Sequence, residues 1–475
     1  MDDTRQKIQM ELAFPSAKRG ESPNAEREGT EPSVAERETE RPAGTERLME
    51  EVLERENLSE ALRRVRSNKG SPGADGMSVE VLPGYLKEHW PSLREQLLAG
   101  SYRPQPVKRV AIPKPDGGTR HLGIPTVLDR FIQQAVLQVL QSRWDGTFSP
   151  HSYGFRPGRS AHQAVSEAQK YIQDGWGWVV DIDLEKFFDR VHHDRLMASL
   201  AKRVLDKRLL KLIRAFLNAG VMENGLVSPT EEGTPQGGPL SPLLSNIVLD
   251  ELDRELEKRG HRFVRYADDC NIYVCSERAG QRVMESISRF ITRRLKLKVN
   301  REKSAVGRPG QRKFLGFSFT WDKEARRRIA PKSIARFKQR VRGLTARSRG
   351  IGVETMIVRL NRFLRGWREY YGHCETPSVL ATLDQWVRRR LRCVVWKQWK
   401  RGRTRFAELR KRKVGKSLAA QTAGSAHGPW RISKSPALSL AVPNAHLGKL
   451  GLLSLAAGTN LTNRTAVYGP VRTVV

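Results

Sequence analysis

Two acidic clusters are the residues of this chain best suited to chemistry. One is Asp268-Asp269 within Tyr266–Asp269, between two apolar, strand-like segments, and the other is Asp181-Ile182-Asp183, about eighty residues earlier. Mg²⁺ prefers oxygen ligands, and phosphoryl transfer through two metals needs carboxylates that hold ions about 3.5–4 Å apart. A tight turn would present both acids at a hairpin tip, and the strand ending at Asp183 could bring a third beside them. The alternative is ordinary polar turn chemistry.

Two phenylalanines follow the earlier acid. The strand is expected to turn into a short helix between Asp183 and Asp189, with Phe187 and Phe188 at the base of a nucleotide pocket. A bulky ring there could exclude a 2′-hydroxyl by contact. For a pair of phenylalanines alone, a place in the hydrophobic core is the favoured interpretation.

Two loops have residues suited to binding a nucleotide. Lys114 and Arg120 lie on either side of a glycine turn and could neutralise a triphosphate, although a charged hairpin tip has the same composition. Gln236 lies in Pro235–Pro242, where a glycine pair allows close backbone approach and Pro and Ser set the start of a helix. That loop could pack under a sugar and base, or serve only as a helix-entry turn.

The charge distribution indicates a polyanionic partner. The 475 residues carry a formal net charge of +34, with a pI near 10.5. Residues 1–56 are net −6, whereas residues 323–416 are net +23 and interleave basic side chains with Trp and Tyr. Such interleaving suits a nucleic-acid groove, while a solvated helical face would not need so one-sided a sign.

Cysteine usage and hydropathy argue against several classes of protein. None of the four cysteines forms a C-x₂-C pair, so the sequence indicates neither a disulfide framework nor a zinc-dependent nuclease module. No signal peptide and no run of about eighteen apolar residues is present. We therefore expect a reduced, cytoplasmic protein with no membrane partner.

The hydrophobic pattern predicts an α+β fold. Helices are expected at about 127–143, 160–174, 194–218, 239–259 and 277–298, with Ser160 and Asp194 as N-caps. Strands are expected near 176–183, 262–266 and 270–275. The resulting β-α-β-β order describes a ferredoxin-like antiparallel sheet backed by helices, followed by a basic helical region over 331–416.

Seven motifs, in order, resemble those of reverse transcriptases encoded within bacterial group II introns, also called maturases. The resemblance extends over about residues 48–463. The motifs are Arg120–Pro125, Ser152–Ser160, Asp183–Asp189, Pro235–Pro242, Tyr266–Asp269, Lys303-Ser304 and Phe314–Phe317.

The resemblance implies a right-hand polymerase with fingers and a ferredoxin-like palm, an α-helical thumb and a short C-terminal DNA-binding tail. The expected boundaries are 1–46 for a mobile N-terminal extension, 47–322 for fingers and palm, 323–420 for the thumb or maturase domain X, and 421–475 for the tail. Many relatives end in a zinc-containing HNH nuclease. The chain has no such cysteine pairs, so we do not expect it to cleave target DNA on its own. The resemblance implies that such members prime on DNA strands at replication forks or open sites.

The resemblance also assigns roles to residues. Asp183, Asp268 and Asp269 are the expected catalytic residues and ligands of two Mg²⁺ ions, whereas Asp181 is not a primary ligand. Phe188 is the expected sugar gate, Gln236 lies beside the nucleotide, and Lys114 and Arg120 contact its phosphates. The expected RNA or DNA contacts are Arg156, Arg159, Lys303, Arg365, Trp367, Arg388, Arg389 and Arg390.

The resulting hypothesis is an intron-encoded RNA-directed DNA polymerase that also binds intron RNA to assist splicing and mobility, by retrohoming through target-primed reverse transcription. Its expected partners are group II intron RNA, an RNA template with a DNA primer, dNTPs and target DNA, with a second copy of the chain as a further candidate. One alternative is a splicing cofactor without polymerase activity. Retron, diversity-generating and CRISPR-associated reverse transcriptases are others, disfavoured by the segment after residue 331, and a viral RNA polymerase would more often carry Gly-Asp-Asp.

Overall fold

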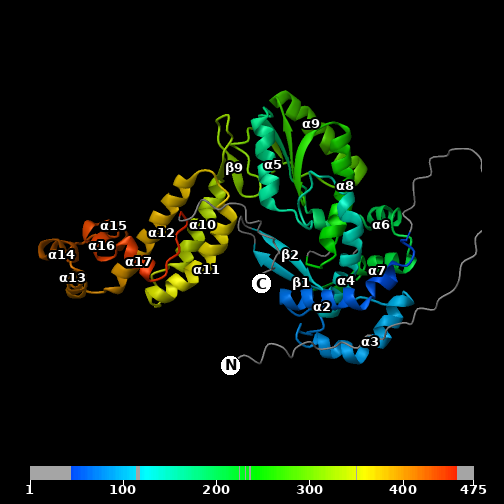
Figure 1. The fold of residues 1–475 in the computed structure, drawn as a ribbon, viewed down its shortest axis with the longest axis horizontal. Coiled ribbons are helices and arrows are strands. Elements are labelled where there is room, and N and C mark those ends of the chain that lie inside the picture. The colour runs from blue at the N-terminus through cyan, green and yellow to red at the C-terminus, as the bar shows by residue number, and fades with distance from the viewer. Residues whose placement is uncertain are drawn as a thin grey trace, which may run out of the picture.

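The computed structural model describes residues 44–113, 118–223, 225–229, 232–234, 237–348 and 350–456. These residues form an α+β unit and a mainly helical C-terminal unit that extends to one side of it (Figure 1). Most of the expected mobile segment 1–46 lies outside them. Its described end is anchored, because Thr45 is buried and its carbonyl accepts a hydrogen bond from Asp206 N.

The central sheet contains four antiparallel strands in the order β6-β7-β3-β8. The strands are β3 (Trp178–Ile182), β6 (Arg262–Tyr266), β7 (Asp269–Val274) and β8 (Ala305–Gly307). Helix α8 (Ser241–Lys258) precedes β6, and α9 (Glu277–Phe290) connects β7 to β8. This is the β-α-β-β-α-β order of a ferredoxin-like fold, so the prediction is confirmed and extended by β8. A three-residue strand is too short to show a period-2 pattern.

The two faces of the sheet pack into different hydrophobic clusters, as strand alternation requires. Val180 and Ile272 face the cluster that contains α8 and α9. Val179 and Tyr273 face the other cluster, with α5 (Ala161–Gln173) and the C-terminal helices. The sheet therefore joins the cores of both units.

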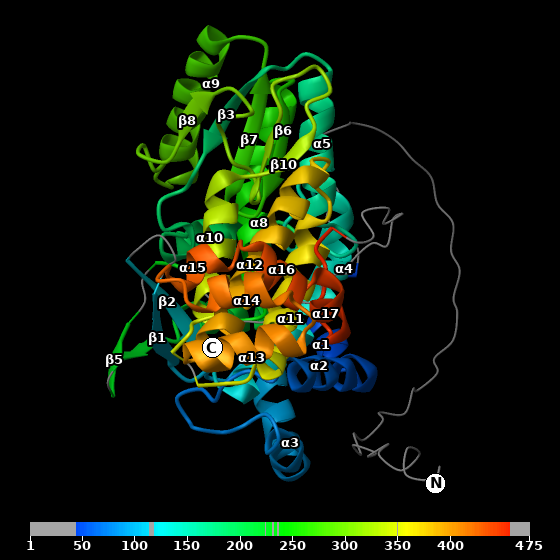
Figure 2. The same cartoon turned by 90° about the vertical axis from the view of Figure 1, so that its left-hand side faces the viewer.

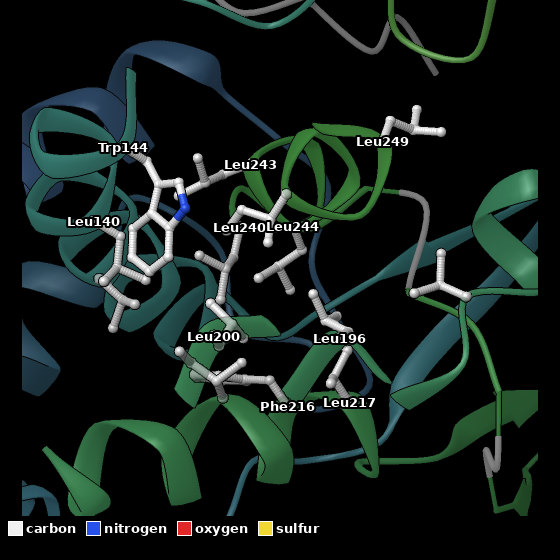
Figure 3. Packing of buried hydrophobic residues seen from close by; sticks show 14 of the residues in the cluster. Leu140, Trp144, Leu196, Leu200, Phe216, Leu217, Leu240, Leu243, Leu244 and Leu249 are labelled. Atoms are coloured by element: carbon white, nitrogen blue, oxygen red, sulfur yellow. The ribbon is translucent and has the colours of Figure 1, made fainter. Parts of the chain in front are cut away.

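The rest of the α+β unit contains a second four-stranded sheet of order β2-β1-β4-β5. Its strands are β1 (Val107–Pro113), β2 (Thr119–Ile124), β4 (Val221–Glu223) and β5 (Leu226–Ser228). The nearby helices are α1 (Leu48–Val52), α2 (Arg55–Asn68), α3 (Leu82–Leu98), α4 (Val127–Trp144), α6 (His193–Ala201) and α7 (Lys207–Leu217). Figure 3 shows Trp144, Leu200, Phe216 and Leu244 packed in the core where α4, α6, α7 and α8 meet.

Local capping explains where the helices differ from expectation. Ser160 caps α5 in a capping box with Gln163, as predicted. The helix expected over 194–218 is instead two helices, because Asp206 accepts hydrogen bonds from Arg208 N and Leu209 N and starts α7. Asp194 is not an N-cap: it lies in the first turn of α6 and pairs with Arg214 at 2.6 Å. The helix expected over 277–298 is α-helical only to Phe290 and continues as a π-helical turn at Ile291–Leu295.

The C-terminal unit contains eight described helices and follows a short hairpin, β9 (Phe317–Phe319) and β10 (Arg327–Ile329). The helices are α10 (Pro331–Leu344), α11 (Val353–Tyr371), α12 (Pro377–Gln398), α13 (Gly402–Lys411), α14 (Lys416–Ala423), α15 (Pro429–Ile432), α16 (Pro436–Ala441) and α17 (Asn444–Lys449). Figure 2, viewed from this unit's end, shows them in front of the α+β unit.

The expected tail boundary between residues 420 and 421 falls within α14. Leu438 and Leu447, on the short helices α16 and α17, are fully buried in the same cluster as Leu391 of α12. The described part of the tail is therefore packed as part of the helical unit. Among the described residues, no helix is long and apolar enough to cross a membrane.

Candidate active site

The acidic turn lies at the end of the central sheet. Tyr266 pairs with Asp269, so Ala267 and Asp268 form a two-residue connection, and Ala267 adopts a positive φ of 57°. On the neighbouring strand Ile182 pairs with Cys270, which places Asp183 just beyond the β3 end next to Asp269. The expected three carboxylates therefore gather at one edge of the sheet.

The protein environment favours the neutral form of the turn carboxyls. Although solvent reaches Asp269, desolvation by the surrounding chain and then the charges of Asp268, Asp181 and Asp183 raise its pKa to about 7. Burial likewise raises the pKa of Asp268, with a further contribution from Asp183, while the charge of Arg120 opposes the rise. A cation nearby would therefore stabilise the charged forms of these carboxyl groups.

The donor set fits a hard divalent cation by its chemistry. Three carboxylates from two adjacent strand ends are the oxygen ligands such ions prefer, and a cation would offset their mutual repulsion. No group of three His, Cys, Asp or Glu side chains in the described chain converges into a preformed metal site. Asp181 is engaged elsewhere, with Arg312 at 2.6 Å, which agrees with the expectation that it is not a primary ligand.

The segment before β8 holds Asp183 in place. The Asp183 backbone N–H donates to Ser304 Oγ at 2.9 Å, and its carbonyl accepts from Asn300 N at 2.8 Å. Lys303 Nζ lies 3.9 Å from Asp183 Oδ1. Lys303 was expected to contact nucleic acid, and the structure places it beside a candidate metal ligand. The role of Ser304 could not be assigned from sequence because it depends on the pairing of β8 with β3.

The acidic turn is supported from beneath by the Ser152–Ser160 motif. Gly154 lies against the Ala267 backbone so closely that a Cβ atom would overlap Ala267 N. Arg265, which sequence reasoning missed, donates to Ala267 O at 3.0 Å and to Ser152 Oγ at 2.8 Å. The available signal was a second arginine on the short strand β6, three residues before Asp268.

The expected nucleotide-binding residues are partly described. Lys114 and Gln236 lie outside the described residues. Phe187 is buried in the core, as the simpler interpretation favoured, and half-buried Phe188 packs edge-on against it with ring centroids 5.3 Å apart. The Phe188 carbonyl accepts from Thr234 N at 2.6 Å.

The loop that carries Gln236 is held on its C-terminal side by β2. Gly237 has a φ of 142°, and its Cα lies so close to Gly123 O that a Cβ would overlap this oxygen. Arg120 lies on the same strand, and its charge reaches Asp268. Among these groups, Arg120 is close enough to the acidic turn for its charge to act on Asp268, and Gly237 packs on the strand that carries Arg120.

Two of the expected nucleic-acid contacts need correction. Arg156 is buried: it pairs with Asp145 at 2.9 Å and donates to carbonyls, including Ser149 O at 2.6 Å. Trp367 is also buried, with its ring 4.4 Å from that of Phe337 between centroids. Both side chains therefore contribute to packing within the protein. The sequence could not show this, because tertiary contacts determine which residues of α11 and of the loop before α5 are buried.

The arginine run 388–390 is also largely engaged within the protein. Arg388 pairs with Asp384 at 3.4 Å, Arg389 stacks 3.7 Å from the Trp430 ring centroid, and Arg390 donates to Thr345 Oγ1. Their contact with RNA stays a prediction, and removing the run would also disturb helix packing. Arg365 is exposed, and Arg159 is half-buried over the Tyr153 ring.

Comparison with known families matches both units. Residues 112–319 match the family described as reverse transcriptase (RNA-dependent DNA polymerase), and residues 334–413 match the group II intron, maturase-specific domain. The chain belongs to the group II intron reverse transcriptase and maturase family. Reverse transcriptases generally depend on divalent metal ions, in keeping with the carboxylate cluster.

Individual relatives are similar to parts of this chain. It is 41% identical over 214 residues to Protein YkfC of Escherichia coli (strain K12), covering 44% of this chain and 56% of that protein. It is 31% identical over 323 residues to Group II intron-encoded protein LtrA of Lactococcus lactis subsp. cremoris, covering 54% of each. The chain thus spans about half the length of these curated relatives. Among solved structures, a partial Cas6-RT-Cas1–Cas2 complex aligns at 25% identity with a TM-score of 0.34, covering 52% of this chain and 42% of that one.

Proposed function

We propose that this chain is an RNA-directed DNA polymerase encoded by a group II intron, and that it also binds intron RNA to assist splicing and mobility. The observation that carries the polymerase proposal is the meeting of Asp183, Asp268 and Asp269 at one sheet edge, within a matched reverse-transcriptase domain. The proposed roles of the parts are fingers and palm for 47–322, thumb and domain X for 323–420, and DNA binding for 421–475.

The proposed reaction is attack of a primer 3′-hydroxyl on the α-phosphate of a dNTP, with release of pyrophosphate. Two Mg²⁺ ions, held by Asp183, Asp268 and Asp269, would activate the hydroxyl and stabilise the charge on the phosphate oxygens. The Asp carboxylates hold their places through the β6-β7 turn and through the Asp183 backbone bonds to Ser304 and Asn300.

The remaining residues would position the nucleotide. We propose that Arg120 and Lys114 neutralise the triphosphate and that Gln236 lies beside the base and sugar. Phe188, half-buried on Phe187, is the proposed barrier to a 2′-hydroxyl, because an edge-on ring against a buried ring has little freedom to move aside. Such a barrier would select dNTPs over NTPs.

The second activity rests on the maturase-specific match and on charge. Residues 323–416 carry a net charge of +23, which suits phosphate contacts along a folded RNA. Exposed Arg365 lies in the matched segment and is the proposed contact that helix packing does not use. Target DNA, as the primer source for retrohoming, is the proposed further partner.

The test compares wild type with Asp268→Asn/Asp269→Asn for dTTP incorporation on poly(rA)/oligo(dT), with intron splicing assayed in parallel. We expect incorporation to fall to background in the variant while splicing persists, because the proposed RNA-binding residues lie mainly on the helical unit. If wild type promotes splicing but makes no DNA, the chain is a splicing cofactor alone and the polymerase proposal fails. Equal dTTP incorporation by both proteins would show that Asp268 and Asp269 are not needed for the reaction.

A further inference from the structure

Arg265 is an unusual residue for the interior of a sheet. Its side chain is fully buried one residue before the turn motif, and so is that of Asp253 on α8. The guanidinium is bidentate to the Asp253 carboxylate, with Nε–Oδ1 at 2.7 Å and Nη2–Oδ2 at 2.5 Å. A buried charge pair needs further hydrogen bonds to offset its desolvation, so the remaining donors are informative.

Those remaining donors point to the acidic turn and its neighbours. Arg265 Nη1 donates to Ala267 O and to Asn246 Oδ1, each at 3.0 Å, and Nη2 donates to Ser152 Oγ at 2.8 Å. Asn246 in turn donates to Gly154 O at 2.9 Å. One planar side chain therefore bonds to α8, to the turn itself and to the segment below it.

The backbone of the same residue makes a second connection. Arg265 N donates to His151 O and Arg265 O accepts from Tyr153 N, each at 2.9 Å, so residues 151–153 pair with the edge of β6. Ala267, next in the turn, holds a positive φ that disfavours a residue with a Cβ. The turn conformation thus depends on contacts from outside the hairpin.

We infer that Arg265 is the positioning residue of the acidic turn, fixing Asp268 and Asp269 relative to α8 and to the Ser152–Gly154 segment. Helix α8 begins at Ser241, immediately after the loop that carries Gln236. Arg265 therefore ties the carboxylates to the helix that follows the proposed nucleotide loop. This inference rests on the proposed polymerase function only for its catalytic consequence, since the geometric role can be measured without substrate.

The primary variant is Arg265→Lys, which keeps the charge but cannot bond to Asp253, Asn246, Ala267 and Ser152 together. We expect faster amide hydrogen exchange in a peptide covering residues 263–270, and weaker Mn²⁺ binding by electron paramagnetic resonance. In the full chain on poly(rA)/oligo(dT), we expect kcat to fall about tenfold or more with KM for primer–template within twofold, because misplaced groups impair the chemical step more than binding.

The matched control is Arg208→Met, which breaks another ion pair to a buried carboxylate, Asp206, at 2.9 Å and far along the chain from the turn. It should lower the melting temperature but leave kcat, Mn²⁺ binding and turn exchange at wild-type values. If Arg265→Lys does not fold, Asn246→Ala and the charge-free double variant Arg265→Met/Asp253→Leu replace it, because neither leaves a buried charge unpaired.

Turn exchange and Mn²⁺ binding that match wild type in a folded Arg265 variant would overturn the inference. So would changes no larger than those of Arg208→Met. If wild type shows no polymerisation but Arg265→Lys loosens the turn and weakens Mn²⁺ binding, the positioning role stands and the proposed polymerase function fails. If wild type polymerises normally and Arg265→Lys is unaffected, the polymerase function stands and the positioning role fails.

Discussion

Lys303 holds its ammonium nitrogen 3.9 Å from the Asp183 carboxylate, one residue before the serine that bonds the Asp183 backbone. The Lys303 side chain is 65% exposed, so this pair is solvated. Its cation therefore lies next to a candidate metal ligand, where it competes with any bound cation for the carboxylate.

Replacing Lys303 with Met should lower the Mg²⁺ concentration for half-maximal dTTP incorporation by about two- to fivefold, because it removes a cation that lies 3.9 Å from the Asp183 carboxylate in a solvated site. The difference should shrink at high salt, since screening weakens exposed pairs. Lys298→Met is the control, as Lys298 is 61% exposed and pairs with Glu185 at 3.1 Å. A higher Mg²⁺ requirement, or equal shifts in both variants, would contradict this account.

Trp367 and Arg365, both on α11, should separate stability from RNA binding. Trp367→Ala removes a buried ring packed on Phe337 and should cost about 3–5 kcal/mol of unfolding free energy, measured by denaturant titration. Arg365→Ala should change stability by less than about 0.5 kcal/mol and reduce the slope of log affinity against log salt by about one. The reverse pattern would show that the indole, and not the guanidinium, contacts RNA.

Arg156→Met should destabilise the chain without changing the salt dependence of RNA binding. The guanidinium is nearly inaccessible and bonds to Asp145 and to Ser149 O, so its loss leaves buried acceptors and a carboxylate unpaired. The cost should be roughly 3–5 kcal/mol, read from the shift in denaturation midpoint. Weaker RNA binding with an unchanged midpoint would restore Arg156 as a nucleic-acid contact.

The His373 contact should make the junction between α5 and the helical unit sensitive to acid. His373 stacks on His162 at 4.7 Å, and its Nε2 lies 2.8 Å from Arg327 Nη1 and 3.1 Å from Ser166 Oγ. Burial, and then the charges of Arg327 and His162, lower its pKa from 6.5 to about 4, against a smaller opposing effect of Glu375. The folded state therefore favours the neutral ring.

The direction of the pH dependence follows from the lowered pKa of His373. The stability that His373 contributes is complete above about pH 6.5 and is lost progressively as pH falls towards 4, because the unfolded chain takes up the proton first. The melting temperature of wild type should therefore fall more between about pH 7.5 and about pH 5 than that of His373→Asn. Exposed His427→Asn is the control and should follow wild type. Parallel curves for all three proteins would exclude this contribution.

The sequence by itself determined the ferredoxin-like strands and the position of the acidic turn. Apolar, strand-like segments on either side of a polar turn are local signals. The pairing of Ile182 with Cys270, which brings Asp183 to Asp269, is a tertiary contact that the sequence only suggested. The Ser160 cap was equally predictable, because a capping box is confined to four residues.

Only the tertiary structure decided which charged and aromatic side chains are free. Arg156, Trp367 and Arg390 have the composition of nucleic-acid contacts, yet each is used for packing by partners distant in the chain or on another element. Arg265 is the opposite case. The sequence did not assign it a function, whereas in the structure its side chain bonds to four residues on three segments around the acidic turn. Burial depends on long-range packing, so residue type and spacing cannot reveal it.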